Sequence, residues 1–203
     1  MNRILILLTF SVLSMALFAQ SHPVTSRLPF KCDTLRITHA EEALGQMINS
    51  YRQSKNLPPV PFSAALSLVA RLHAIDLAEN YRPGGRCNLH TWSKSPYWSS
   101  CCYTPDHRNA ACMWDKPREL TSYTGDGFEI AYYTSDETVP DIVLAEMALK
   151  GWKSSRGHHE IIINRGKWHD VDWKAMGIGM YRGYAIIWFG ELTDEAGSPR
   201  LLH

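Results

Sequence analysis

Residues 174–191 read KAMGIGMYRGYAIIWFGE, and this stretch decides the fold class. Two apolar runs flank the pair Arg182 and Gly183, which is the pattern of two strands joined by a tight turn. The second run, YAIIWF, is apolar without alternation, and such a run indicates a strand that is buried on both faces. The sequence therefore predicts a sheet near the end of the chain with other elements packed against both of its faces.

The preceding part of the chain predicts helices. Thr38 and Glu41 match a capping box at the start of the first helix. Ser63 can cap a second helix that is apolar on two sides, which is typical of a helix at the centre of its domain. Pro140 is acceptable at the first position of a third helix. These helices are predicted over residues 38–54, 63–81 and 140–152. Helices followed by strands, without β-α-β alternation, indicate an α+β layered domain.

Composition and charge limit the class of partner. The chain has 203 residues, 45% of them hydrophobic and 20% charged, with a formal net charge of +1. These values suit one globular domain. A balanced charge gives no electrostatic reason to expect nucleic acid or an anionic membrane surface as a partner. We expect a monomer.

The first 19 residues have the layout of a secretory signal peptide. Arg3 precedes an apolar run that begins at Ile4, and Ala19 is a small residue at the expected cleavage point. Polar residues interrupt the run, which argues against a membrane anchor, and no later segment is long and apolar enough to span a bilayer. We expect an exported protein in the periplasm or the extracellular medium. The expected organisation is a signal peptide over 1–19, an extended arm over 20–37, a domain over 38–192 and a tail over 193–203.

Export makes disulfide bonds the first interpretation of the cysteines. Four of the five fall in the region 82–127, which has no sustained periodicity; they are Cys87, Cys101, Cys102 and Cys112. Cys101 and Cys102 are not expected to bond each other, because a ring of adjacent cysteines strains the backbone. Each is expected to pair elsewhere, the connectivity is left open, and Cys32 is a candidate for the odd thiol. A structural zinc site that also uses His90 and His107 is the alternative.

The stretch 152–164, WKSSRGHHEIIIN, fails the simplest test for a metalloenzyme. HEIII begins like the zinc motif HExxH, but Ile163 stands where the second histidine is required. The chain also has no nucleophile elbow, P-loop or dinucleotide-binding glycine motif. His73 lies on an apolar stripe of the second predicted helix, and we interpret it as a hydrogen-bonded histidine at the edge of the core.

Five blocks, taken in order along the chain, resemble one family of secreted proteins. The resemblance is to the CAP superfamily, which includes cysteine-rich secretory proteins, insect venom antigens and plant pathogenesis-related proteins, and above all to its compact bacterial, SCP-like branch. The blocks are LVARLHAIDLAEN (68–80), CNLHTWS (87–93), GDGFEIAYY (125–133), ALKGWKSSRGHH (148–159) and MGIGMYRGYAIIWFGE (176–191). Each block is weak alone, and their common order gives the resemblance its strength.

The resemblance implies an α-β-α sandwich with a central cleft that carries two histidines and one or two glutamates. His90 and His158 match the two histidine positions. Alignment on the residues after Glu129 places Phe128 at the family's glutamate and Glu129 at the neighbouring asparagine, so Glu129 reaches the site only if the register slips by one residue. Ser155 replaces the second glutamate of the family. His159 is expected to be an exposed neighbour.

The resemblance thus implies a metal-binding cleft formed by His90, His158 and Glu129, with zinc or another divalent cation as the expected cofactor. Two imidazoles and a carboxylate leave an open coordination position on zinc. A role for Glu129 in proton transfer is a weaker hypothesis, and whether the protein is an enzyme stays open. The alternatives are a non-catalytic module that binds a lipid, an envelope polymer or a protein, and, below that, a secreted hydrolase.

Overall fold

The computed structural model describes residues 31–203, and the predicted signal peptide lies outside this range. Its sheet has three antiparallel strands in the order β2-β4-β3. They are β2 (Phe128–Tyr133), β3 (Ala175–Tyr181) and β4 (Tyr184–Gly190). The predicted hairpin is confirmed: Arg182 and Gly183 form its turn, both with positive φ, as a tight hairpin turn requires. All seven residues of the central strand β4 are buried, as its apolar run predicts.

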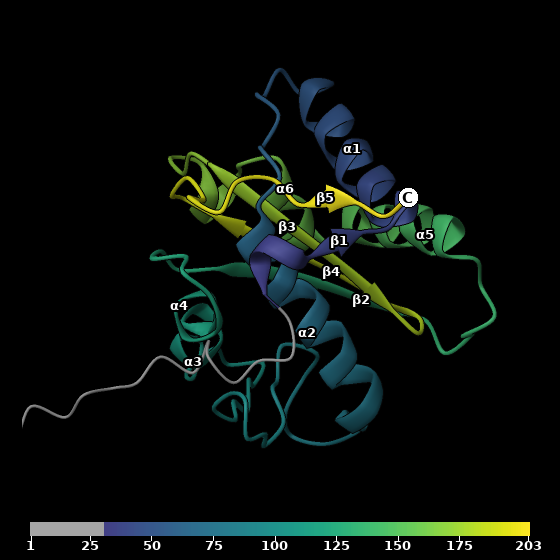
Figure 1. Cartoon of the computed structure of the whole chain (residues 1–203), viewed down its shortest axis with the longest axis vertical. Helices are drawn as coiled ribbons and strands as arrows, with labels where there is room; N and C mark the ends of the chain where they lie inside the picture. Colours follow the sequence, from purple (N-terminus) through teal and green to yellow (C-terminus); the bar gives the residue numbers. More distant parts are fainter. Residues whose placement is uncertain (1–30) are drawn as a thin grey trace, which may run out of the picture.

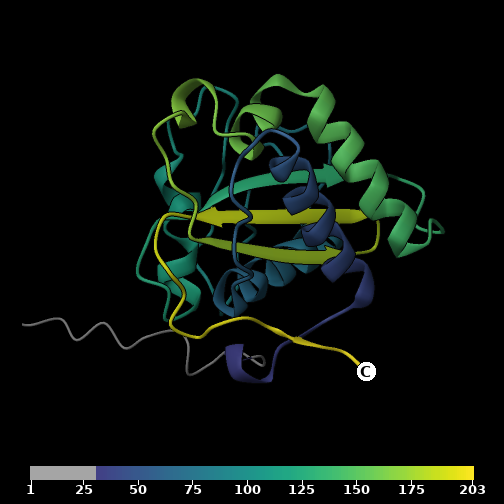
Figure 2. The same ribbon diagram turned by 90° about the horizontal axis from the view of Figure 1, so that it is seen from above.

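Helices cover both faces of the sheet (Figures 1 and 2). One face carries α1 (His39–Gln53), α5 (Asp141–Ser154) and α6 (Arg156–Ile162), and the other carries α2 (Ala64–Asn80), α3 (Ala111–Trp114) and α4 (Lys116–Leu120). Successive residues of β4 contribute to two separate cores: Ile186 and Trp188 pack on the α2 side, whereas Ile187 and Phe189 pack on the α1 and α5 side. The predicted α+β fold, a three-layer α-β-α sandwich with a disulfide-stapled loop region, is confirmed.

The long helices begin and end close to their predicted limits. Thr38 caps α1 through the predicted capping box with Glu41, and Ser63 caps α2. Pro140 is the N-cap of α5 rather than its first helical residue. The short helices α3, α4 and α6 and strand β2 were not predicted, because each is too brief to show a periodic pattern.

The two ends of the described chain pack against each other. Strand β1 (Arg36–Ile37) pairs in parallel with β5 (Arg200–Leu201), so parts of the expected arm and of the expected tail join one small sheet. Asp194 is buried, and its Oδ2 accepts hydrogen bonds from Ser63 Oγ (2.7 Å) and Ala65 N (2.9 Å) at the start of α2. Within residues 31–203 no helix has the length and apolar character needed to cross a membrane.

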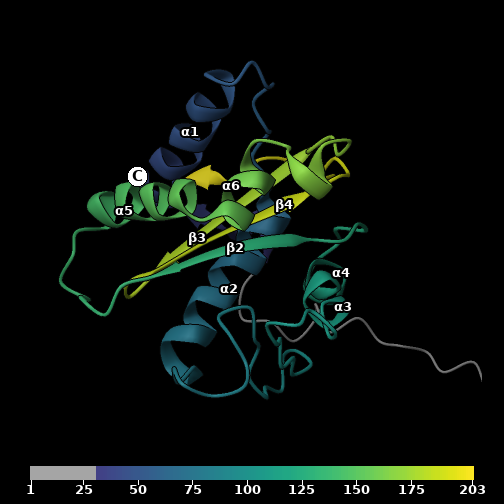
Figure 3. The same cartoon turned by 180° about the vertical axis from the view of Figure 1, so that it is seen from behind.

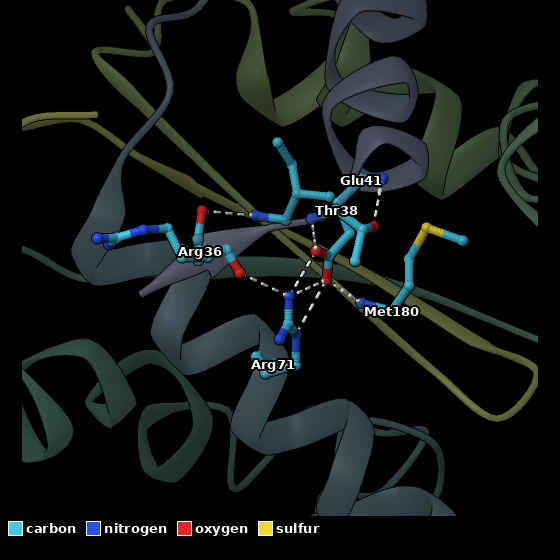
Figure 4. Close-up of polar contacts among 7 residues, drawn as sticks. Arg36, Thr38, Glu41, Arg71 and Met180 are labelled. Atoms are coloured by element: carbon cyan, nitrogen blue, oxygen red, sulfur yellow. Dashed lines mark hydrogen bonds and ion pairs between the residues drawn. The ribbon is translucent and has the colours of Figure 1, made fainter. Parts of the chain in front are cut away.

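Glu41 is a fully buried carboxylate that connects three elements (Figure 4). It accepts hydrogen bonds from Thr38 N (2.7 Å), Arg71 Nε (2.9 Å) and Met180 N (2.9 Å). The Arg71 guanidinium also contacts both carboxylate oxygens. Each oxygen therefore has a donor, which a buried carboxylate requires. Helices α1 and α2 and strand β3 are held in one relative position by this group.

Helix α2 approaches β3 so closely that no side chain fits between their backbones. A Cβ atom at Gly177 would overlap the backbone of Leu66, and one at Gly179 would overlap the backbone of Ala70 and Arg71. Ser67 Oγ accepts a hydrogen bond from Ile178 N (3.1 Å) at the same contact. The two glycines of the GIG sequence are thus required by packing rather than by backbone conformation.

The loop region between α2 and α3 lies below the sheet in the view of Figure 3. Two disulfides staple it by joining Cys87 to Cys102 and Cys101 to Cys112, so the adjacent cysteines pair with separate partners, as expected. The zinc alternative for this cluster is wrong, because sulfurs in disulfides are not available as thiolate ligands. Cys32 is the free thiol, and burial raises its pKa to about 11, with a smaller contribution from Asp194.

We expect Gly177→Ala to lower the free energy of unfolding by about 1–3 kcal/mol or more, because the added methyl group forces α2 away from β3. Urea denaturation followed by circular dichroism measures this change. Gly157→Ala is the matched control, since a Cβ at Gly157 meets no heavy atom within 4 Å. Equal stability of the two variants would contradict the close packing.

We expect a Cys101→Ser, Cys112→Ser double variant to lose about 2–4 kcal/mol of stability, since the bond closes a loop with a sequence separation of 11. Cys101 also exchanges backbone hydrogen bonds with Trp92 (2.8 and 2.9 Å) beside His90. Thermal unfolding measures the loss, and Cys32→Ser, which removes only the free thiol, is the control. A melting temperature equal to that of the control would show that the bridge adds no stability.

Candidate functional site

A cavity of about 230 Å³ opens where β2 begins, between the disulfide-stapled loop and α6. Its polar lining contains both predicted site histidines, His90 and His158, together with Glu129. Further polar lining residues are Tyr103, His107, Glu160 and Lys167, and the apolar lining includes Met113, Trp114, Phe128, Ile130, Ile161 and Trp168. The structure therefore brings the three predicted metal-site residues to one cavity.

His90 is held by the loop on one side and by the sheet on the other. Its backbone N donates to Asn88 Oδ1 (3.0 Å), and its ring lies edge-on to Tyr103 with centroids 5.1 Å apart. Its Nδ1 lies 2.7 Å from Glu129 Oε1. Because an ionised carboxylate only accepts hydrogen bonds, Nδ1 is the donor in this contact, and Nε2 is the ring nitrogen that is not bonded to Glu129. The side chain is 18% exposed, so the imidazole is accessible from the cavity.

Glu129 lies in β2 and is fully buried at its side chain. Its Oε1 contacts His90, and its Oε2 contacts His73 Nδ1. Burial alone would raise the pKa of this carboxyl, but the neighbouring His73 and His90 outweigh burial and hold the pKa below its usual value. The carboxyl is thus ionised at neutral pH, with one imidazole on each oxygen.

His158 lies in α6, just after the break that separates this helix from α5. Burial lowers its pKa to about 4, and the nearby His90 contributes to the same shift, while Glu129 opposes it. The imidazole is therefore neutral at physiological pH, which is the form that binds metal ions. Its neighbour His159, expected to be exposed, is instead partly buried, and its Nε2 is hydrogen-bonded to Tyr51 OH (2.8 Å).

His73 is part of this cluster, although its residue pattern indicated an ordinary core-edge histidine. It is completely buried on α2, its Nε2 lies 2.8 Å from Thr91 O, and its ring stacks on Trp92 with centroids 4.4 Å apart. The interpretation as a hydrogen-bonded histidine holds, but one of its partners is Glu129. The only sequence signal for this role is its position inside the block at 68–80.

Aromatic side chains form one wall of the cavity. Trp114, Phe128 and Trp168 come from three different segments and contact one another in series, with ring centroids 5.7 and 5.0 Å apart. The Lys167 ammonium lies 4.6 Å from the Trp168 ring. The cavity thus has one wall of imidazoles and one apolar wall, the combination found in sites that bind small organic molecules.

The donor set is smaller than that of a three-ligand metal centre. Over residues 31–203 no three or more His, Cys, Asp or Glu side chains are placed together as they would be around a metal ion. Glu129 is engaged by histidines at both oxygens, which leaves the imidazoles of His90 and His158 as the donors of the predicted set that face the cavity. Two imidazoles can hold a divalent cation only if other ligands complete its coordination.

Solved structures of three bacterial proteins are similar to the chain. A cysteine-rich secretory protein from Staphylococcus aureus has 17% sequence identity and a TM-score of 0.46, over 75% of this chain and 38% of that chain. An extracellular protein containing a SCP domain from Bacillus anthracis has 16% identity and a TM-score of 0.48, over 75% and 40%. An outer surface protein from Borrelia burgdorferi has 19% identity and a TM-score of 0.46, over 75% and 92%.

The chain thus spans less than half of the first two proteins. No curated protein is significantly similar to it in sequence. The profile of the family described as "CAP: Cysteine-rich secretory protein family" matches residues 46–185, which is more than half of the chain and contains His73, His90, Glu129 and His158. The chain therefore belongs to the CAP family.

Proposed function

We propose that the chain is an exported CAP domain whose cavity binds a divalent cation through the imidazoles of His90 and His158. The observation that carries the proposal is the contact of His90 Nδ1 with the buried carboxylate of Glu129. This contact fixes the orientation of the imidazole and leaves Nε2 unbonded to Glu129, in a ring that lines the same cavity as His158. A metal-binding histidine commonly has this arrangement, with a carboxylate on its second nitrogen.

In this proposal Glu129 is a positioning residue rather than the third metal ligand that the resemblance implied. Each of its oxygens contacts an imidazole, and its side chain has no exposed surface, so the two histidines cover the carboxylate from the cavity. The remaining coordination positions are left to water or to a bound molecule. A cation with such open positions can polarise an oxygen of that molecule.

The aromatic wall supports a small organic molecule as the occupant of the rest of the cavity. Phe128 and Trp168 are partly exposed and line the same space as the two imidazoles. Apolar contact with these rings would hold the molecule, while its polar end reaches the cation. Export is supported by the signal-peptide pattern of residues 1–19. The extracellular and outer-surface descriptions of two similar proteins are consistent with it.

We expect a His90→Ala, His158→Ala double variant to bind zinc at least about a hundredfold more weakly than the wild type, because both protein donors are lost. Competition with a chromophoric chelator, using protein first stripped with EDTA, measures the affinity. The control is His169→Ala, which removes a histidine whose side chain is 78% exposed and outside the cavity lining. Equal zinc affinity in the double variant and the wild type would refute the cation site.

We expect Glu129→Gln to lower zinc affinity by about 10–100-fold, since His90 loses the charged acceptor that orients it. Glu160→Gln is the matched control, because Glu160 lines the same cavity but pairs with Arg156 instead of a histidine. Circular dichroism of both variants establishes that they are folded. A loss of zinc affinity in Glu160→Gln that equals or exceeds the loss in Glu129→Gln would contradict the positioning role of Glu129.

A further inference from the structure

A second cavity, of about 350 Å³, lies between the C-terminal end of α2 and the disulfide-stapled loop. Figure 1 shows the loop beside this end of the helix. The volume falls in the range of small-molecule sites, which is about 300–1,000 Å³. None of its lining residues lines the cavity that contains His90 and His158. It is therefore a separate space with its own chemistry.

The walls of this second cavity are held in place by covalent bonds and by a short antiparallel bridge. Cys87, Cys101 and Cys102 all line it, and each belongs to one of the two disulfides. Trp92 and Cys101 form the bridge, with backbone hydrogen bonds of 2.8 and 2.9 Å. Because these walls are fixed before a ligand arrives, binding there costs little conformational entropy.

The charge that the second cavity presents to a ligand is positive. Arg82 and Arg86 line it, and neither forms an ion pair in the described part of the chain. The lining carboxylate, Asp76, is 3% exposed and is already used by the protein. Its oxygens accept hydrogen bonds from Ser93 N (2.8 Å), Ser93 Oγ and Asn80 Nδ2 (2.9 Å). Two guanidinium groups therefore remain without a counter-charge.

The two arginines differ in what their guanidinium groups contact. Arg82 Nη1 donates to Tyr81 O (2.8 Å) just after the end of α2, where the helix dipole favours a cation. This contact accounts for Arg82 without a ligand. Arg86 is exposed, and within residues 31–203 its guanidinium has no hydrogen-bond partner. Its planar N–H donors are thus available, and their geometry matches two oxygens of a carboxylate or a phosphate.

The rest of the lining suits an apolar body. Leu77, Tyr81 and Trp92 supply aliphatic and aromatic surface beside the disulfide sulfurs. Trp92 is 2% exposed, and its indole Nε1 has no hydrogen-bond partner among the described residues. A buried donor without an acceptor is unfavourable, so an oxygen of a ligand that reached Nε1 would gain a hydrogen bond that the protein leaves unmade.

We propose that this second cavity is a binding site for a small organic anion, namely a carboxylate or a phosphate ester with an apolar body. Arg86 binds the anionic group through paired N–H donors, and the apolar body lies against Leu77, Tyr81 and Trp92. The site needs no metal ion, and none of its residues belongs to the cation site proposed above. Either site can thus exist without the other.

NMR titration of nitrogen-15-labelled protein, stripped with EDTA, tests the proposal with 3-phenylpropionate and phenyl phosphate as probes. We expect saturable shifts of backbone amides in residues 80–87 and 91–102, and the probe that binds more tightly identifies the anionic group. The alcohol 3-phenylpropanol has the same apolar body as 3-phenylpropionate without the charge, and we expect it to bind at least about tenfold more weakly than that acid. Absence of shifts in these segments with both anions would overturn the proposal.

Arg86→Met is the variant that tests the anion contact, because it keeps an unbranched side chain and removes the guanidinium donors. We expect it to weaken binding of the tighter probe at least about tenfold, since charge-assisted hydrogen bonds are lost. The control is Arg108→Met, which removes an arginine that pairs with Asp106 and lies outside the cavity lining. Equal affinity of Arg86→Met and the wild type would refute the anion site. Because the protein is free of metal, that result leaves the zinc test of His90 and His158 unaffected.

Discussion

The contact between the backbones of α2 and β3 is the constraint on which the rest of the structure depends. Gly177 and Gly179 remove the side chains that would otherwise separate the helix from the sheet. Without these side chains, the backbone of α2 at Leu66 and Ala70 lies directly against β3. At this separation the middle of the helix touches the strand directly, and Ser67 receives a backbone hydrogen bond from Ile178.

Polar side chains on α2 then position the other elements. Arg71 pairs with buried Glu41 and so links α2 to α1. Asp76 accepts a hydrogen bond from Ser93 N (2.8 Å) and anchors the loop that carries His90. His73 reaches Glu129 in β2 and Thr91 O in the same loop. Because these contacts arise from one rigid helix, the geometry of the cavity is set by the same packing that sets the fold.

The sequence predicted the elements that have a long apolar period, but it could not predict the direction of Glu129. The hairpin of β3 and β4 and the helices α1, α2 and α5 extend over enough residues to show their periodicity. Strand β2 is six residues long, and alternation along it sends Phe128 and Glu129 to opposite faces. A shift of one residue exchanges the two faces. Only the pairing of Glu129 with Trp188 in β4 settles that Glu129 faces α2 and His73.

This alternation also explains how the cavity combines two kinds of wall. Phe128 lies on the face of the sheet that carries α6 and contacts Trp168 and Trp173, whereas Glu129 lies on the α2 face among histidines. The cavity forms at the first residues of β2, where residues from both faces of the sheet line the same space. The carboxylate is covered by His73 and His90, so it orients an imidazole and does not present its own oxygens to the cavity. Under the proposed function, such a cavity would select a ligand through imidazole nitrogens and aromatic faces, so the preferred ligand would have both a metal-coordinating group and an apolar part.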